Sequence, residues 1–395
     1  MKIRIALWLV IAAMAQLLAV AHADPREEAE KAEVARQAAF RSGMEAIVGE
    51  LNAGSFRGFL AAIDKADMLE RIFALRLIDP KVKKSFSESY EYSLESIIKS
   101  GFDVPDSGMR ATLLGVESRN DRGRAVVRFD EDNFTFRYHE YDLRLNKAGK
   151  VVIVDWIDFL SSDRFTDSVG LYLVSGAPSQ PAMRKLVDIP NPTDREMFQF
   201  AELLKAARDV SLDRYLKIRD DMSERFRKQR VVVVTTAQLA RTVRQRRKMI
   251  AAVEILANTY PDEPRYSLML LDYYFPSRKY EEAMQALQRL SKRLGVDDAA
   301  MDARFSATAL VLGNTADALA YAEKATEREP GLELGWWSSL QVRAEMSDFA
   351  GATEVLKTLQ DDFGYDMSPE FLQRDRSYAQ LLASGDYKRW RESIK

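Results

Sequence analysis

The sequence predicts an α+β N-terminal domain, with helices and a four-stranded antiparallel meander, followed by an all-α domain of repeated helices. Three patterns carry this prediction. Apolar residues recur at helical spacing before residue 100, alternate with polar ones over residues 111–159, and then follow a repeat of about 34 residues to the C-terminus. At roughly 150 residues per domain, a chain of 395 residues is long enough for two such domains.

The composition excludes several classes of protein. The chain has 58 basic and 60 acidic residues, so its net charge of −2 gives no general attraction to nucleic acid or membranes. It has no cysteine, which excludes disulfides, thiol catalysis and thiolate metal sites. Only two histidines are present, His22 and His139, too few for a multi-histidine metal site. We therefore expect no metal and no cofactor.

The first residues have the pattern of a secretory signal. Lys2 and Arg4 precede a mostly apolar run from Ile5 to Val20. Ala21 and Ala23 then flank His22, which matches the small-x-small pattern of a signal-peptide cleavage site. This predicts a signal peptide over residues 1–23, cleaved after Ala23, and a periplasmic or secreted protein. The alternative is a permanent anchor, because about 17 apolar residues are at the lower limit for spanning a bilayer. Cleavage would leave no stable membrane anchor.

Residues 24–160 are predicted to form the α+β domain. Helical patterns run from Arg26 to about Leu75 and from Ser85 to Lys99. Four strands with short turns follow, which predicts an antiparallel meander covered on one face by the helices: Ala111–Ser118, Arg124–Phe129, Phe134–Leu145 and Val151–Phe159. Residues 161–193 are rich in proline and glycine, and we interpret them as a linker with a short helix near 167–174.

This order of elements resembles the cone-shaped folds of the nuclear transport factor 2 and cystatin classes. The former class includes isomerases, hydrolases and simple ligand-binding modules, so the resemblance does not select a function.

One residue of the last predicted strand is a candidate for chemistry. Alternation places Asp155 on the same face as Val151, Ile153, Ile157 and Phe159, where a buried carboxylate has a raised pKa and can act as a general base. His139 and Tyr141 share a face of the neighbouring strand and would line the same concavity. The alternative is that Asp155 only hydrogen-bonds a turn or pairs with Arg137.

The C-terminal half repeats. Small residues recur every 34 or 35 positions at Ala283, Ala318 and Ala352, each followed by apolar residues at helical spacing. The stretch from Gly313 to Trp336 resembles the tetratricopeptide repeat most closely. That resemblance implies that residues 194–395 form a solenoid of about six helical hairpins. It also places Val231–Val234 in a helix, although four consecutive valines favour a strand.

The same resemblance predicts where a partner binds. In tetratricopeptide arrays the first helix of each hairpin lines a concave groove that holds peptides or partner helices. The residues expected there are Phe200, Leu204, Gln238, Arg241, Arg265, Asp272, Trp337 and Gln341, with Ala303 and Ala307 between them. Mixed aromatic and arginine positions are typical of binding hot spots. The alternative is that some of these residues pack against the N-terminal domain.

One charged stretch also stands out. Residues 225–248 hold nine cations and no acidic residue, which indicates a solvated helix face or a site for an anionic partner.

Together these patterns predict an exported scaffold of the cell envelope that binds another protein or a peptide, and no nucleic acid. Two alternatives stay open. The N-terminal domain could be a small-ligand binder or an isomerase- or hydrolase-type enzyme that uses Asp155, or the two halves could bind each other in a purely structural role.

Overall fold

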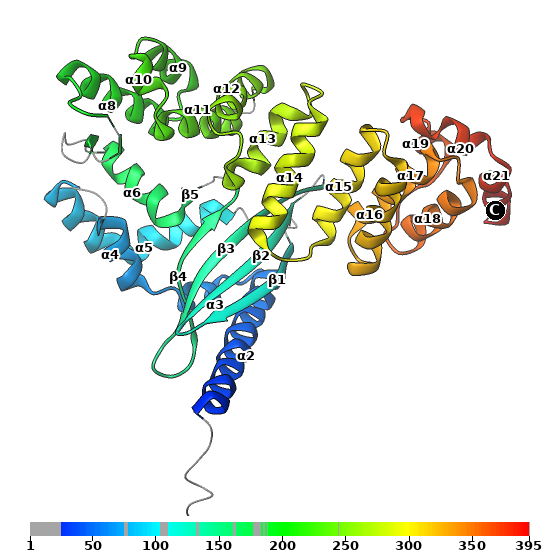
Figure 1. Cartoon of the computed structure of the whole chain (residues 1–395), viewed down its shortest axis with the longest axis horizontal. Coiled ribbons are helices and arrows are strands. Elements are labelled where there is room, and N and C mark those ends of the chain that lie inside the picture. The colour runs from blue at the N-terminus through cyan, green and yellow to red at the C-terminus, as the bar shows by residue number, and fades with distance from the viewer. Residues whose placement is uncertain are drawn as a thin grey trace, which may run out of the picture.

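The computed structural model describes residues 25–74, 78–102, 110–131, 134–160, 163–176, 183–184, 186–187, 189–243 and 245–394. Over these residues a sheet domain is followed by a long all-helical part (Figure 1). The predicted signal peptide, residues 1–23, lies outside the described residues. Within the described ranges, no helix combines the length and the apolar character that crossing a bilayer requires.

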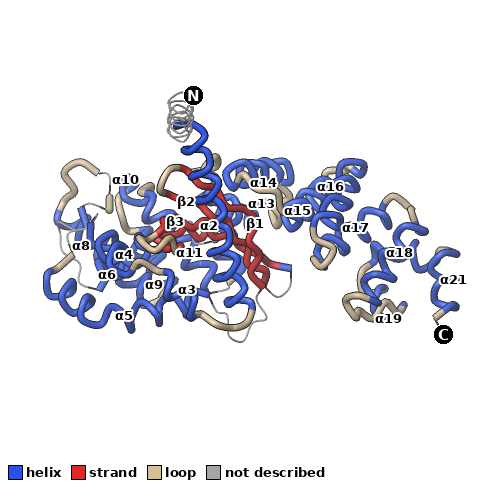
Figure 2. The backbone as a smooth tube through the Cα atoms, turned by 90° about the horizontal axis from the view of Figure 1, so that it is seen from below, coloured by secondary structure: helices blue, strands red, loops and turns tan. Residues whose placement is uncertain are grey.

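Helices precede the sheet. They are α2 (Pro25–Asn52), α3 (Arg57–Ala62), α4 (Lys65–Ala74) and α5 (Pro80–Phe102). The second half of α2 buries Phe40, Met44 and Leu51 at helical spacing against one face of the sheet. Figure 2 shows α2 running across the strands. The helix ends where Gly54 takes a φ of +75°, a conformation that costs glycine little.

The sheet has five strands, so the prediction of four is wrong by one. They are β1 (Arg110–Arg119), β2 (Arg122–Glu131), β3 (Thr135–Leu145), β4 (Val151–Asp158) and β5 (Asp163–Arg164), and neighbours in the chain pair antiparallel in the order β1-β2-β3-β4-β5. The fifth strand has only two residues, too short to leave a period-two pattern in the sequence.

A β-bulge changes which side chains share a face of β4. Leu143 of β3 lies opposite Ile153, but Asp142 lies opposite Asp155, so Val154 is an extra residue on β4. The predicted alternation is therefore wrong beyond Ile153. Trp156 joins Ile153 on the α2 side, while Asp155 points to the opposite side.

Helices cover one face of the sheet and part of the other. One face shares a core with α2 and the other N-terminal helices, and the other face packs against the helical part (Figures 1 and 2). After β5 the chain continues into α6 (Phe165–Gly176), where the linker was predicted to hold a short helix. The helix α6 contacts both β4 and the first helix of the helical part.

The helical part begins with a capping box. The Thr193 hydroxyl accepts a hydrogen bond from the Glu196 amide, and the Glu196 carboxylate accepts one from the Thr193 amide, which starts α8. The longer helices that follow are α8 (Asp194–Arg208), α9 (Leu212–Asp220), α11 (Arg230–Thr242), α12 (Arg246–Thr259), α13 (Ser267–Tyr274), α14 (Tyr280–Leu294), α15 (Ala299–Val311), α16 (Thr315–Arg328), α17 (Glu333–Glu345), α18 (Phe349–Asp361) and α21 (Gly385–Ser393). Shorter helices are α10 (Glu224–Arg227), α19 (Pro369–Leu372) and α20 (Ala379–Ala383).

Consecutive helices pack on one another in this part of the chain. From α11 to α18 each helix contacts the next. Ala283, Ala318 and Ala352 are each the fourth residue of their helix and each is fully buried, so neighbouring helices approach closely there. Residues 231–234 are helical, as the repeat pattern predicted, because burial of three of the four valines outweighs their strand propensity.

The contact between the two halves depends on a glycine. Gly115 lies at a β-bulge of β1, and a Cβ built on it would be 2.6 Å from Cγ1 of Val296, in the loop between α14 and α15.

We expect Gly115→Ala to lower the free energy of unfolding by about 1–3 kcal/mol through overpacking. Val296→Ala should restore part of that loss in the double variant. Urea unfolding of the two single variants and the double variant tests this, and simple additivity of the two effects would contradict it.

Candidate functional site

The region where the helical part meets the sheet has an apolar centre. Tyr138 and Ile157 from the sheet pack in one core with Leu287 and Leu290 of α14 and Phe305 of α15. This sheet face is therefore buried where α13–α15 cover it, and the two halves share a core.

A buried arginine joins the two halves beside this core. Arg128 of β2 has no exposed surface, and its guanidinium reaches carboxylates from three elements. It donates to Asp130 at 2.6 and 2.9 Å, to both oxygens of Glu329 at 2.9 Å, and to Asp298. Asp298 also accepts a hydrogen bond from the Tyr138 hydroxyl at 2.5 Å and from the Met301 amide at the start of α15.

The charges in this cluster stabilise one another. Burial alone would lower the pKa of Arg128, but Asp298, Asp130 and Glu329 outweigh burial and raise it, so the guanidinium stays charged. Burial, followed by the charge of Asp298, raises the pKa of Tyr138 well above its usual value, so its hydroxyl stays a donor. A buried charge is tolerated only when it is paired and hydrogen-bonded, and the cluster meets that condition.

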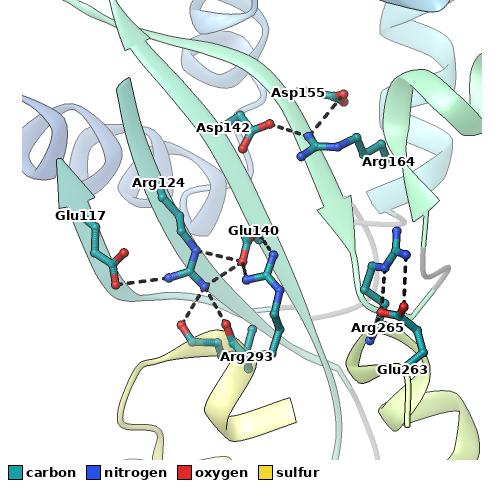
Figure 3. Close-up of polar contacts among 10 residues, drawn as sticks. Glu117, Arg124, Glu140, Asp142, Asp155, Arg164, Glu263, Arg265 and Arg293 are labelled. Carbon is teal, nitrogen blue, oxygen red and sulfur yellow. Dashed lines mark hydrogen bonds and ion pairs between the residues drawn. The ribbon is translucent and has the colours of Figure 1, made fainter. Parts of the chain in front are cut away.

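A second cluster ties β2 and β3 to the end of α14. Figure 3 shows Glu140 between Arg124 and Arg293, which donate to it at 2.5–2.9 Å. Arg124 also donates to the backbone carbonyls of Arg293 and Leu294, which have no partner within the last turn of a helix. Burial raises the pKa of Glu140, but the hydrogen bonds from both arginines outweigh burial and lower it.

Asp155 is the first of the predicted catalytic residues, and it is fully engaged. Its side chain is 1% exposed and accepts hydrogen bonds from the Trp156 amide, the Thr166 amide and the Thr166 hydroxyl. Its nearest cation is Arg164 at 3.7 Å, rather than Arg137 (Figure 3). Burial raises its pKa against these hydrogen bonds. Asp155 therefore holds the start of α6 against β4.

His139 and Tyr141 lie on the other face of the sheet. The His139 Nδ1 is 3.0 Å from the Tyr141 hydroxyl, and both side chains are buried among aromatic residues such as Phe129 and Trp156. Burial, aided by the charge of Arg137, lowers the pKa of His139 well below its usual value, so the imidazole is neutral. The structure brings these two residues together but does not bring Asp155 to them.

The residues predicted for the groove differ in accessibility. Phe200 and Leu204 of α8 lie in a core, 0% and 2% exposed, where a partner does not reach them. Gln238 lies 3.5 Å from the carboxylate of Asp163 in β5, so the sheet domain contacts α11 directly. Arg230 of the same helix donates to Asp163 at 2.6 Å.

The other charged residues of the predicted groove pair with each other or with near neighbours. Arg241 of α11 and Asp272 of α13 form an ion pair of 2.6 Å between the two helices. Arg265 binds Glu263 at 3.0 Å (Figure 3). Of the eight residues predicted to bind a partner, only Gln341, at the C-terminal end, is exposed.

At that end Trp337 lies in an aromatic cluster. Its ring is 5.2 Å from Tyr365 and 6.3 Å from Phe371 between centroids, and the indole is only partly buried. Gln341, one turn further along α17, is exposed. One turn before Trp337, Glu333 and Leu334 line a cavity of about 410 Å³, together with Tyr365 of the helical part and Phe134 and Phe136 of the sheet domain. Aromatic and polar side chains therefore form one continuous surface here.

The sequence did not predict the Arg128 and Glu140 clusters. One signal was present, because Arg124 and Arg128 share the face of β2 that carries Val126. Arginines on both sides of a valine on one strand face indicate that another part of the chain covers that face, but they do not identify which part. Among the described residues, no group of three or more histidine or acidic side chains could hold a metal ion.

The fold defines the chain as an α+β sheet domain joined to a long helical part. No protein-family model matches it, and a comparison with curated proteins finds no match.

We expect Arg128→Met to lower the free energy of unfolding by about 3–5 kcal/mol, because it leaves three carboxylates without their cation. Tyr138→Phe is the control, since it removes one hydrogen bond and keeps the ion pairs, at a cost of about 1 kcal/mol. Urea unfolding measures both variants. Equal costs would show that Arg128 does not hold the two halves together.

The neutral His139 makes stability depend on pH. Because its pKa is lower in the folded protein than in the unfolded chain, the unfolded chain binds the proton first as pH falls. We therefore expect the free energy of unfolding to decrease below about pH 6.5, by up to about 1.4 kcal/mol per pH unit. In His139→Gln this dependence should be absent between about pH 6.5 and 5.5. Parallel pH profiles for the two proteins would contradict the assignment.

Proposed function

We propose that this protein is an exported cell-envelope scaffold of the tetratricopeptide type, which binds another protein or a peptide on the concave side of its helical part. The regular burial of Ala283, Ala318 and Ala352 and the packing of successive helices support a stacked array of hairpins. The long α2 across an antiparallel meander supports a cone-like sheet domain. Export is proposed from the signal pattern of residues 1–23.

The observation that carries the proposal is the aromatic surface around Trp337. Binding energy at protein interfaces concentrates in a few tryptophan, tyrosine and arginine side chains. Trp337, Tyr365 and Phe371 form such a group, and Arg374 lies 5.6 Å from the Phe371 ring centroid. The helices from α17 onward extend away from the sheet, which supports an accessible position (Figure 1).

The sheet domain has a supporting role in this proposal. It contacts α11 through Asp163 and covers α14 and α15 through the Arg128 and Glu140 clusters. A fixed sheet would hold the array in one curvature, so that less conformational freedom is lost when a partner binds. Because Asp155 is engaged with α6 and lies on the opposite face from His139 and Tyr141, the geometry favours no reaction at these three residues.

The test is a pull-down from a cell-envelope fraction of the organism that makes the protein, with the whole mature chain as bait and mass-spectrometric identification of what is retained. We expect Trp337→Ala to reduce the retained partner at least tenfold, because a central tryptophan contributes about 2 kcal/mol or more to binding.

The matched control is Trp336→Ala. This neighbouring tryptophan is also partly buried, but its Nε1 is bound to the carbonyl of Pro330 at 2.7 Å. The proposed surface predicts that this variant retains the partner. Loss of the partner in both variants, or in neither, would overturn the proposed site.

A further inference from the structure

A groove of about 750 Å³ lies on the sheet face opposite α2, at the end of the strands that α13 and α14 do not cover. The β1–β2 hairpin, β3 and α4 contribute its walls. Its lining holds six arginines and four acidic residues, so its net charge is 6 − 4 = +2. The volume is within the range of pockets that bind small molecules.

Three of these arginines form a row across three strands. Arg119 of β1 lies directly opposite Arg122 of β2, and Arg122 lies directly opposite Arg144 of β3. Directly opposed residues of antiparallel strands point to the same face, so the three side chains enter the groove together. Like charges in directly opposed positions destabilise a sheet. The row therefore destabilises the sheet when no ligand is bound, and a bound anion would relieve the repulsion between the arginines.

Three of the four acidic residues of the groove pair outside this row, and the fourth, Asp121, is exposed in the turn between Arg119 and Arg122 and forms no ion pair with them. Glu117 pairs with Arg124 at 3.3 Å, Asp142 with Arg164, and Asp67 with Arg71 at 2.5 Å. Figure 3 shows the first two of these pairs.

Within the row itself, Arg144 pairs with Asp64, from just before α4. By contrast, the side chains of Arg119 and Arg122 are exposed and form no ion pair or hydrogen bond with any residue in the described part of the chain. The groove thus presents two guanidinium groups that no carboxylate binds, beside a third, with the single charge of Asp121 between them.

We propose that the row formed by Arg119, Arg122 and Arg144 binds a ligand that carries two or more linked phosphate groups. Neighbouring strands lie about 4.8 Å apart, so the three residues span about 10 Å. Each guanidinium presents a planar fork of donors that matches phosphate oxygens.

A compact phosphate ligand fits this spacing better than an acidic peptide. Two linked phosphates place several negative charges within about 10 Å, whereas carboxylates on one side of an extended peptide lie about 7 Å apart with one charge each. The same chemistry is offered by a free polyphosphate compound and by a lipid head group with two phosphates.

The first experiment titrates the mature full-length chain with inorganic tripolyphosphate and measures binding by calorimetry. The second measures co-sedimentation of the same chain with phosphatidylcholine vesicles with and without cardiolipin. The variant Arg119→Gln/Arg122→Gln should weaken binding about tenfold or more, because it removes two charged donors. Its thermal midpoint should stay equal or rise, because the like-charge contact is relieved.

The matched control is Arg246→Gln/Arg247→Gln, which removes the same charge from two exposed arginines at the start of α12. It should change binding less than twofold. Saturable binding of tripolyphosphate assigns a free ligand, and binding only to cardiolipin vesicles assigns a lipid head group. Equal weakening in both double variants, or no binding to either tripolyphosphate or cardiolipin vesicles, would overturn the proposal.

Discussion

Arg128 determines how the two halves of this protein lie relative to each other. It stands in β2, yet two of the carboxylates that it binds belong to the residue after α16 and to the residue before α15. The same Asp298 side chain caps α15 and accepts the Tyr138 hydroxyl, so the start of that helix and the face of the sheet share one acceptor. Any movement of the sheet against α15 would leave these buried groups unpaired, which is costly in an apolar setting.

The two-sided burial of the sheet follows from that contact. A meander usually turns one face to solvent, but here α2 covers one face and the helical part covers half of the other. The uncovered half carries many exposed charges, while the covered half is apolar except for Arg128 and the carboxylates that it binds. The residues on this face therefore change from apolar to charged along each strand. On β3 the change occurs between Tyr138 and Arg144, with Glu140 at the boundary, where it binds arginines from both halves.

Much of this architecture could be predicted from the sequence, because local patterns determine it. Four strands and most helices follow from period and turn residues, and residues 231–234 are helical because burial of three of the four valines outweighs their strand propensity. The bulge at Val154 leaves no local signal, so the facing of Asp155 was predicted incorrectly. The pairing of Arg128 with Asp298 joins residues far apart in the chain, and no periodicity reports such a contact. The burial of Phe200 was also not predicted, because the residues that cover it, such as Tyr215 and Phe226, lie outside its own helix.

The distance along the chain between Arg128 and its partners has a consequence for folding. An array of helical hairpins folds through contacts between neighbours and can begin anywhere along its length. Here residues 128 and 329 are 201 positions apart, and residues 138 and 298 are 160 apart. Such contacts raise the contact order, and high contact order slows folding. Because the residues that flank α15 and α16 complete their buried polar pairing only against a formed sheet, the middle of the helical part gains its full stability after the N-terminal domain has folded. The two halves then unfold as one cooperative unit.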